Sequence, residues 1–266
     1  MNKITLFGEK IISSNADVEK MLIHKDSKTL FEMAEEQISA GASVIDINTA
    51  LLMKDELNAM LWAVRLLIDK FDVKISIDSP DSGVLERCIK EFGNRVIANS
   101  LPADTEVLGR MLAIISEYQS GVVIILKNRS GIPEDSKGRL KLAGRAVNLI
   151  EEAGIPPEDV YLDPIITTIG TDTNGGKLVL DCFAKLEEYY PAYQRLGGLS
   201  NISFGLPLRK LLNRTFLSMA IARGMNAVIC DPTDRKLLET LRAAEAIAGA
   251  DPGCRDFLAY YRNINK

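Results

Sequence analysis

Eight short β-rich runs alternate with helical patterns along the chain, and this alternation limits the possible folds more than any other feature of the sequence. Repeated strand–helix units favour a parallel sheet, because a parallel connection needs a crossover long enough to hold a helix. Eight units predict a closed (β/α)8 TIM barrel, whereas an open doubly wound sheet more usually has about five to seven strands. The runs are KITLFGE from residue 3, VIDINT from 44, KISIDS from 74, RVIANS from 95, GVVIILKN from 121, VYLDP from 160, LGGLSNIS from 196 and NAVICDP from 226.

A single domain over residues 1–266 is expected, because such a barrel needs about 250 residues and no low-complexity linker interrupts the series. The segments between the strands are amphipathic. In the segment that starts at Asp55, apolar residues recur at helical spacing and are expected to cover the sheet: Leu57, Leu61, Val64, Leu67 and Ile68. The tail from Cys254 predicts one short additional helix.

Charge and composition narrow the class of partner. The net charge is -4 and the basic residues are scattered, so we expect no nucleic-acid partner. No apolar run approaches the roughly 18 residues of a membrane span, and the N-terminus lacks a signal-peptide core, so we expect no membrane partner and a cytoplasmic location. The four cysteines lie far apart without a C-x-x-C pair, which predicts neither a zinc site nor a disulfide framework.

Each predicted strand ends in a carboxylate or an amide. For any one of these residues, a turn or a helix cap is the simpler explanation, but in a closed barrel all eight ends meet at the mouth where active sites lie. We therefore predict a binding site at this mouth. The strand-end residues are Glu9, Asp46 and Asn48, Asp78, Asn99, Asn128, Asp163, Asn201 and Ser203, and Asp231.

A ring of carboxylates and amides without Lys or His suits a neutral, flat heterocycle that offers several donors and acceptors, and it suits a phosphate poorly. The only histidine, His24, comes before the first helical pattern, which argues against a Ser-His-Asp arrangement at the mouth. A Mg²⁺ site formed by Asp46, Asp78 and Asp163 is the weaker alternative. We expect no metal bound by this chain.

Several blocks of the sequence resemble the pterin-binding barrels that transfer a methyl group between tetrahydrofolate and a corrinoid protein. The blocks are GASVIDINTA, ISIDSP, VIANS, KNRSGIP, YLDP and GLSNISFGLPLRKLLNRTFLSMAIARGMNAVICDP, and the similarity covers essentially the whole chain. The nearest groups are methyltetrahydrofolate:corrinoid/iron-sulfur protein methyltransferase and the folate-side methyltransferases of O-demethylase systems. The resemblance implies a dihydropteroate-synthase-like pterin-binding barrel.

The resemblance also implies roles for residues and partners. Asp78, Asn99 and Asp163 would hydrogen-bond the pterin, and Asn201 would lie near pterin N5 as the catalytic residue. The substrates would be tetrahydrofolate or 5-methyltetrahydrofolate and a corrinoid (cobalamin) carried on a partner protein, and the enzyme would be a homodimer. The other strand-end residues are predicted as further pterin contacts: Asp46, Asn48, Ser203, Asn128 and Glu9.

The sequence departs from the family pattern at two places. The first strand reads EKII where the family often has ERIN, and Phe204 replaces a common glutamine. Two alternative functions stay open, namely a dihydropteroate synthase, whose NxTxDSFSDGG and ESTRPG blocks are absent, and a non-catalytic pterin-binding protein. For Asn201 the alternative role is a cap for the helix that starts near Leu208.

Overall fold

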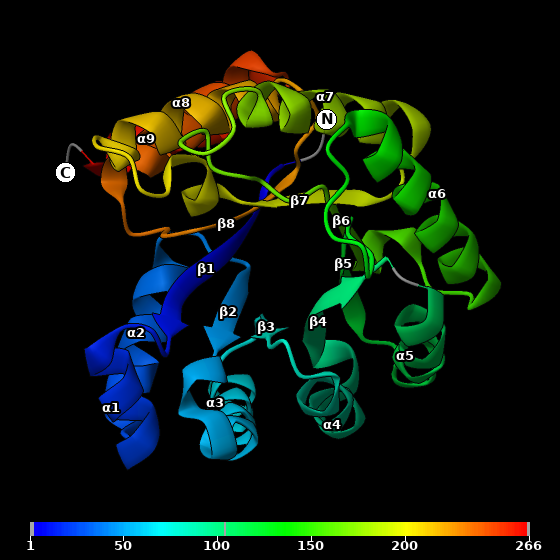
Figure 1. Cartoon of the computed structure of the whole chain (residues 1–266). Helices are drawn as coiled ribbons and strands as arrows, with labels where there is room; N and C mark the ends of the chain where they lie inside the picture. The colour runs from blue at the N-terminus through cyan, green and yellow to red at the C-terminus, as the bar shows by residue number, and fades with distance from the viewer. Residues whose placement is uncertain (1–2, 104, 265–266) are drawn as a thin grey trace.

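The computed structural model describes residues 3–103 and 105–264, and its eight strands close into a parallel barrel in chain order (Figure 1). Each strand pairs with the next, and β8 pairs with β1. This architecture confirms the predicted (β/α)8 barrel. The strands are β1 (Thr5–Ile12), β2 (Val44–Asn48), β3 (Lys74–Asp78), β4 (Val96–Pro102), β5 (Gly121–Ile125), β6 (Val160–Asp163), β7 (Gln194–Gly198) and β8 (Ala227–Cys230).

Helices surround the barrel on its outside (Figure 1). Two of them, α1 and α10, are additions to the eight repeats, and α10 confirms the helix predicted in the tail. Among the residues described, no helix combines the length and the apolar character that a membrane crossing needs. The helices are α1 (Ala16–His24), α2 (Ser27–Ser39), α3 (Glu56–Lys70), α4 (Ser82–Phe92), α5 (Thr105–Tyr118), α6 (Ser136–Glu152), α7 (Gly175–Tyr189), α8 (Arg209–Ile221), α9 (Arg235–Ile247) and α10 (Arg255–Ile264).

Helix α3 covers the barrel as predicted, but the centre of its buried face is shifted. Met60 and Ala63 are fully buried, whereas Leu57 and Leu61 are half-buried and pack at the edge of the core. The small side chain of Ala63 fits the centre of the contact, where little room remains between helix and sheet. The predicted stripe nevertheless faces the core, because Val64 and Leu67 are fully buried and its other members pack against the core.

An apolar layer fills the barrel at the beginning of its strands. Within this layer the rings of Phe7 and Tyr161 meet edge to face, with their centroids 5.1 Å apart. The layer fills the barrel interior below the strand ends, so a ligand would reach the polar strand ends from the C-terminal mouth. Its buried members are Phe7, Val44, Ile97, Val123, Tyr161, Leu196 and Ala227.

Four predicted strands end elsewhere than expected, and one of them, β4, continues past Asn99 to Pro102. β7 stops at Gly198, and the following residues form a 3-10 turn, η4 (Leu199–Ser203), in which the Phe204 N–H donates to the Asn201 carbonyl at 3.2 Å. A glycine pair at the end of a strand is a weak strand former, so the chain turns there. β5 ends at Ile125, before Asn128, and β1 continues past Glu9 with an irregular register.

Candidate functional site

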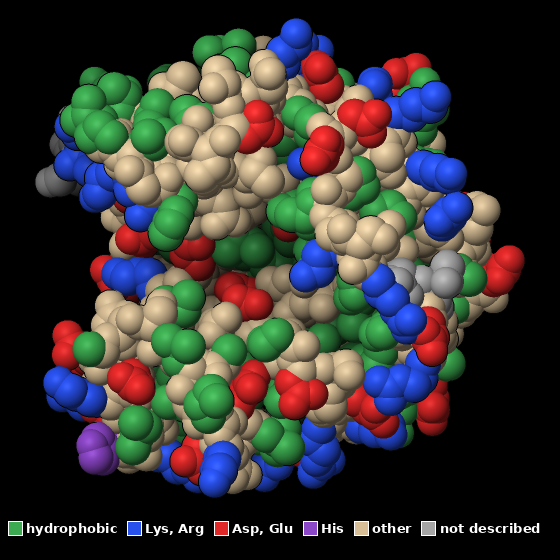
Figure 2. Space-filling view, viewed as in Figure 1, with side chains coloured by type: hydrophobic (Ala, Val, Ile, Leu, Met, Phe, Trp, Pro, Cys, Tyr) green, Lys and Arg blue, Asp and Glu red, His purple; other side chains and the backbone are tan. Residues whose placement is uncertain are grey.

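Three neighbouring strands place polar side chains next to one another at the mouth. The strand register sets Asn48 beside Asp78 and Asp78 beside Asn99. The Asn48 amide nitrogen donates to Asp78 Oδ2 at 2.7 Å. Asp46 lies two residues before Asn48, on the same face of its strand, and is only 6% exposed. Figure 2 shows a central hollow on this face of the molecule, with acidic side chains along its walls.

Asn99 connects two layers of this site. Its Nδ2 donates to Asp46 Oδ1 and to Ser76 Oγ, both at 3.2 Å. Its amide oxygen accepts no hydrogen bond from the residues that the structure describes. Because the donors of the amide are already used inside the protein, Asn99 presents an acceptor to a ligand.

Burial shifts the acidity of the carboxyl groups in this ring. It raises the pKa of Glu9 to about 7, with a further increase from the charge of Asp231 and an opposing effect from Arg209. Burial, and then the charge of Asp78, raise the pKa of Asp46 well above its usual value. The pKa of Asp78 is raised mainly by burial, against the hydrogen bond from Asn48. A ligand that donates N–H groups would stabilise these carboxylates, so the ring favours such a ligand.

Asp163 ends β6 at the same mouth. Its Oδ1 accepts the Ile165 N–H at 2.7 Å, and burial raises its pKa to about 6 against this hydrogen bond and the charge of Arg139. Arg139 of α6 is buried and donates to the carbonyls of Pro164 at 2.6 Å and Ile165 at 2.9 Å. Arg139 therefore fixes the backbone that directly follows Asp163. The sequence analysis missed Arg139, although an arginine within the apolar stripe of a helix was a usable signal.

Asn201 lies in the turn η4, and its side chain is exposed above the end of β7. Arg209 holds this turn, because its Nη2 donates to the Ser200 carbonyl at 2.8 Å and its Nε to Ser203 Oγ at 3.2 Å. Helix α8 starts without a side-chain cap, and Leu208 occupies the capping position. The alternative in which Asn201 caps this helix is therefore wrong, while its contact with a ligand stays a prediction.

The structure does not bring Ser203 and Asn128 into the ring. Ser203 is fully buried, and its hydroxyl donates to Asn213 Oδ1 at 2.6 Å. Asn128 lies in a turn after β5, where its side-chain oxygen accepts the Ser130 N–H at 2.9 Å. The hydroxyl of Ser203 and the side-chain oxygen of Asn128 are therefore already engaged in local hydrogen bonds.

Charged side chains near the first strand also lie outside the ring. Lys10 follows Glu9 within β1, although no strand-end lysine was expected, and its Nζ donates to Glu36 at 3.0 Å and to Thr233 at 3.1 Å. His24 is exposed at the end of α1. Over the described ranges 3–103 and 105–264, no three Asp, Glu, His or Cys side chains are grouped so that they could hold a metal ion.

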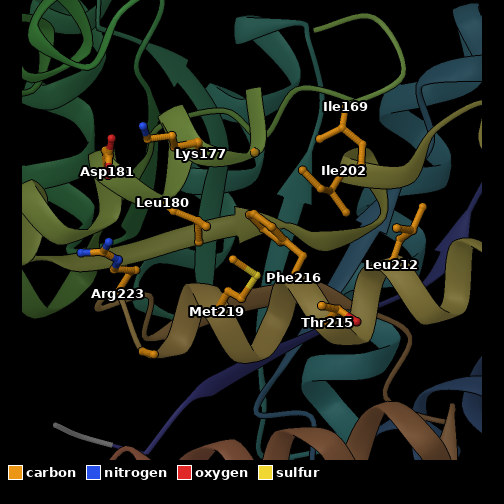
Figure 3. Close-up of a pocket in the computed structure, with 12 residues that line it drawn as sticks. Ile169, Lys177, Leu180, Asp181, Ile202, Leu212, Thr215, Phe216, Met219 and Arg223 are labelled. Atoms are coloured by element: carbon orange, nitrogen blue, oxygen red, sulfur yellow. The ribbon is translucent and has the colours of Figure 1, made fainter. Parts of the chain in front are cut away.

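An apolar groove lies on the outer wall, between α7 and α8 (Figure 3). Its volume is about 540 Å³, and its walls include Leu180, Phe216 and Met219. It shares no residue with the ring at the mouth, so it is a separate surface.

Sequence comparisons connect this chain to pterin chemistry. The profile of the family described as pterin binding enzyme matches residues 13–231. Methylcorrinoid:tetrahydrofolate methyltransferase of Eubacterium limosum is 27% identical over 262 residues, which cover 97% of this chain and 96% of that protein. Methionine synthase of Mycobacterium tuberculosis is 23% identical over 239 residues, which cover 85% of this chain but only 20% of that longer protein.

Comparison of structures gives the same fold. The dihydropteroate synthase of Coxiella burnetii, solved in complex with pteroic acid, aligns with a TM-score of 0.70 and 16% sequence identity, covering 94% of this chain and 95% of that one. At this level of identity the likeness concerns the fold alone. It confirms the predicted dihydropteroate-synthase-like barrel.

Proposed function

The chain belongs to the family of pterin-binding enzymes, and on this premise we propose that it is a methyltransferase that moves a methyl group between a corrinoid protein and N5 of tetrahydrofolate. The relative from Eubacterium limosum, which matches over almost its full length, bears the name of this reaction. The resemblance and the activity inferred from the sequence are confirmed at the level of these comparisons. The observation that carries the proposal is the ring of buried acceptors at the mouth.

The ring has the acceptors that a pterin needs. The edge of a pterin donates through N3–H and the 2-amino group, and carboxylates accept such bonds strongly. We propose that Asp78 and Asp163 accept these N–H groups and that the free amide oxygen of Asn99 accepts a further one. Three further residues would support this contact. Asn48 donates to Asp78, Asp46 accepts from Asn99, and Glu9 is close enough to Asp78 for that charge to raise its pKa.

Methyl transfer to or from N5 depends on position and electrostatics more than on acid–base chemistry. The cobalt of the corrinoid, carried on its own protein, is the other partner of the methyl group. We propose that the exposed amide of Asn201 meets N5 while charge develops there. The rigid turn η4, tied to α8 through Arg209, would keep this amide in place during the reaction.

The function is tested directly with purified protein, tetrahydrofolate and methylcobalamin as the corrinoid. We expect the absorption band of methylcobalamin to decay and 5-methyltetrahydrofolate to accumulate only when the protein is present. Formation of dihydropteroate from a pterin pyrophosphate and p-aminobenzoate would support the synthase instead. Folate binding without any turnover, with free methylcobalamin or with a methylcorrinoid protein, would indicate a non-catalytic binding protein.

Exposed apolar side chains at two places on the rim of the mouth form what we call the collar. Leu51, Met53, Phe204 and Leu208 stand in the loops after β2 and β7, and between 59% and 76% of each residue is exposed. Exposed apolar residues grouped around a site commonly mark a protein interface. We propose that this collar docks the corrinoid protein, which must bring a large ring up to the mouth.

Docking on the collar predicts a selective kinetic effect. Met53→Asp and Phe204→Asp should each raise the KM for the corrinoid protein about tenfold, because each puts a charge into an apolar contact, while the Kd for folate stays unchanged. Steady-state kinetics and calorimetry measure the two constants. Ile247→Asp is the matched control, since Ile247 is 88% exposed at the end of α9. An unchanged KM in both collar variants would contradict the docking site.

The raised pKa of Asp163 predicts how the affinity for folate depends on pH. A donor ligand binds the ionised carboxylate, and the pKa of this group is raised to about 6, so affinity should fall as the pH drops from 7 to 5. Below pH 6 this single group can weaken binding by up to about tenfold per pH unit. Calorimetry across pH 5–8 measures the Kd, and Asp163→Asn should flatten this part of the profile. Tighter binding at low pH would contradict the assigned contact.

We also infer that the enzyme is a homodimer, as the sequence resemblance implies. The apolar groove between α7 and α8 supplies a face that a second copy could cover, because Met219 there is half exposed (Figure 3). Met219→Lys should shift the protein toward the monomer in analytical ultracentrifugation. A wild-type protein that sediments as a monomer at micromolar concentration would contradict this inference.

A further inference from the structure

A cationic groove of about 730 Å³ lies where α8 and α9 begin, on the rim of the mouth. In a chain with a net charge of -4, this local excess of positive charge stands out. Of the cations in this groove, the methyl transfer proposed above uses only Arg209, which holds the turn η4. The cations that line the groove are Arg209, Lys210, Arg214, Arg235 and Lys236.

Two acidic side chains neutralise only part of this charge. Lys210 pairs with Asp234 at 3.3 Å, and Arg235 pairs with Glu239 at 3.1 Å. Five positive charges less two negative ones leave a net charge of +3. Arg214 and Lys236 form no ion pair with the described part of the chain. The groove therefore attracts an anion that carries more than one charge.

The groove lies next to a smaller cavity at the ring of acceptors, because the two share lining residues. The lining of this smaller cavity, of about 130 Å³, includes Glu9 and Asp231 as well as Lys210 and Asp234. The last two residues also line the groove. A ligand whose heterocycle is held in the ring can thus extend an anionic end toward the cations along this path. Figure 2 shows Lys and Arg side chains at the edge of the molecule on the side of α8 and α9.

We propose that the groove binds the glutamate tail of folate and makes the enzyme selective for oligoglutamate forms. This inference rests on the proposed function. Tetrahydrofolate carries its pterin at one end and glutamate carboxylates at the other, and each additional glutamate adds one negative charge. Arg214 and Lys236, which form no ion pair with the described residues and take no part in holding the turn η4, are the residues that later glutamates meet.

The test compares tetrahydrofolate with one and with three glutamates, by calorimetry at about 50 mM salt. Wild-type protein should bind the triglutamate at least about tenfold more tightly, and this preference should shrink at about 300 mM salt because the contact is ionic. The double variant Arg214→Gln/Lys236→Gln should reduce the ratio of the two dissociation constants to about one. Lys141→Gln, which removes an exposed lysine from α6, should leave the ratio unchanged.

Other results would overturn the inference. Equal affinity of the wild-type protein for the two forms would do so, and phosphate binding to the groove without such a preference would assign it to a free inorganic anion. An unchanged ratio in the double variant, with a raised KM for the corrinoid protein, would assign the groove to an acidic partner surface. If the protein bound no tetrahydrofolate at all, the proposed function itself would fail, and the inference would fail with it.

Discussion

Replacing Asn201 with alanine should lower the rate constant of methyl transfer about a hundredfold, while the Kd for folate rises less than about threefold. The exposed amide makes no hydrogen bond with the described residues, and N5 gains or loses charge during the transfer. An interaction that strengthens as this charge develops lowers the activation free energy of methyl transfer. A hundredfold change in the rate constant corresponds to about 2.7 kcal/mol of this activation free energy. Single-turnover measurements at saturating folate give the rate constant.

Two further variants separate this role from a structural one. Asn201→Ser should remain slow, because its hydroxyl cannot reach as far as the amide and no helix cap depends on residue 201. A Cβ atom added at Gly198 would lie 3.1 Å from Asn201 Nδ2, so Gly198→Ala should displace the amide and cause an intermediate loss of rate. Unchanged turnover in Asn201→Ala, or full recovery with serine, would refute the catalytic assignment.

Replacing Asp78 with alanine should weaken folate binding about thirtyfold, or roughly 2 kcal/mol, while the rate at saturating folate falls much less. The change removes a charge-assisted acceptor from the pterin edge. It also leaves the Asn48 amide without the acceptor that it now meets at 2.7 Å. Calorimetry or ligand fluorescence gives the Kd for the wild-type protein and the variant.

Separate controls for Asp78 test whether its negative charge matters and whether folate binding needs a metal ion. Asp78→Asn keeps the size and one acceptor oxygen, so its Kd should lie between those of the wild-type protein and the alanine variant. Asp69→Asn removes an exposed carboxylate from α3 and should have no effect. A Kd within twofold of wild type in Asp78→Ala would contradict the pterin contact. Loss of binding on chelation, restored by Mg²⁺, would point to the carboxylate metal site.

The fold and much of the ring could be predicted from the sequence, because both depend on local patterns. Eight alternating units have few ways to bury their strands, and Asp46, Asn48, Asp78 and Asn99 follow from where three buried strands end. In the structure these four residues hydrogen-bond or lie in register as neighbours. A position near the end of a predicted strand was therefore a sound guide to the residues that lie side by side here, even in β4, which continues to Pro102.

The remaining features depend on contacts between distant parts of the chain. The pKa of Glu9 reaches about 7 through burial and through Asp231, which lies more than two hundred residues away in sequence. The position of Asn201 depends on a turn that follows a glycine pair and on a hydrogen bond from Arg209. Ser203 was misjudged as a strand end because its burial against Asn213 arises only after helix α8 packs there.

The apolar layer around Phe7 and Tyr161 also constrains the kinetics, because it fills the interior of the barrel below the mouth. Folate and the corrinoid protein would have to use the same opening. Folate would lie inside the mouth, and the docked corrinoid protein would cover it. Folate must then bind first and leave last, which is a compulsory-order mechanism. A corrinoid protein that docks on the unloaded mouth would form a dead-end complex, so a large excess of this partner should slow turnover, and a large excess of folate should relieve the inhibition.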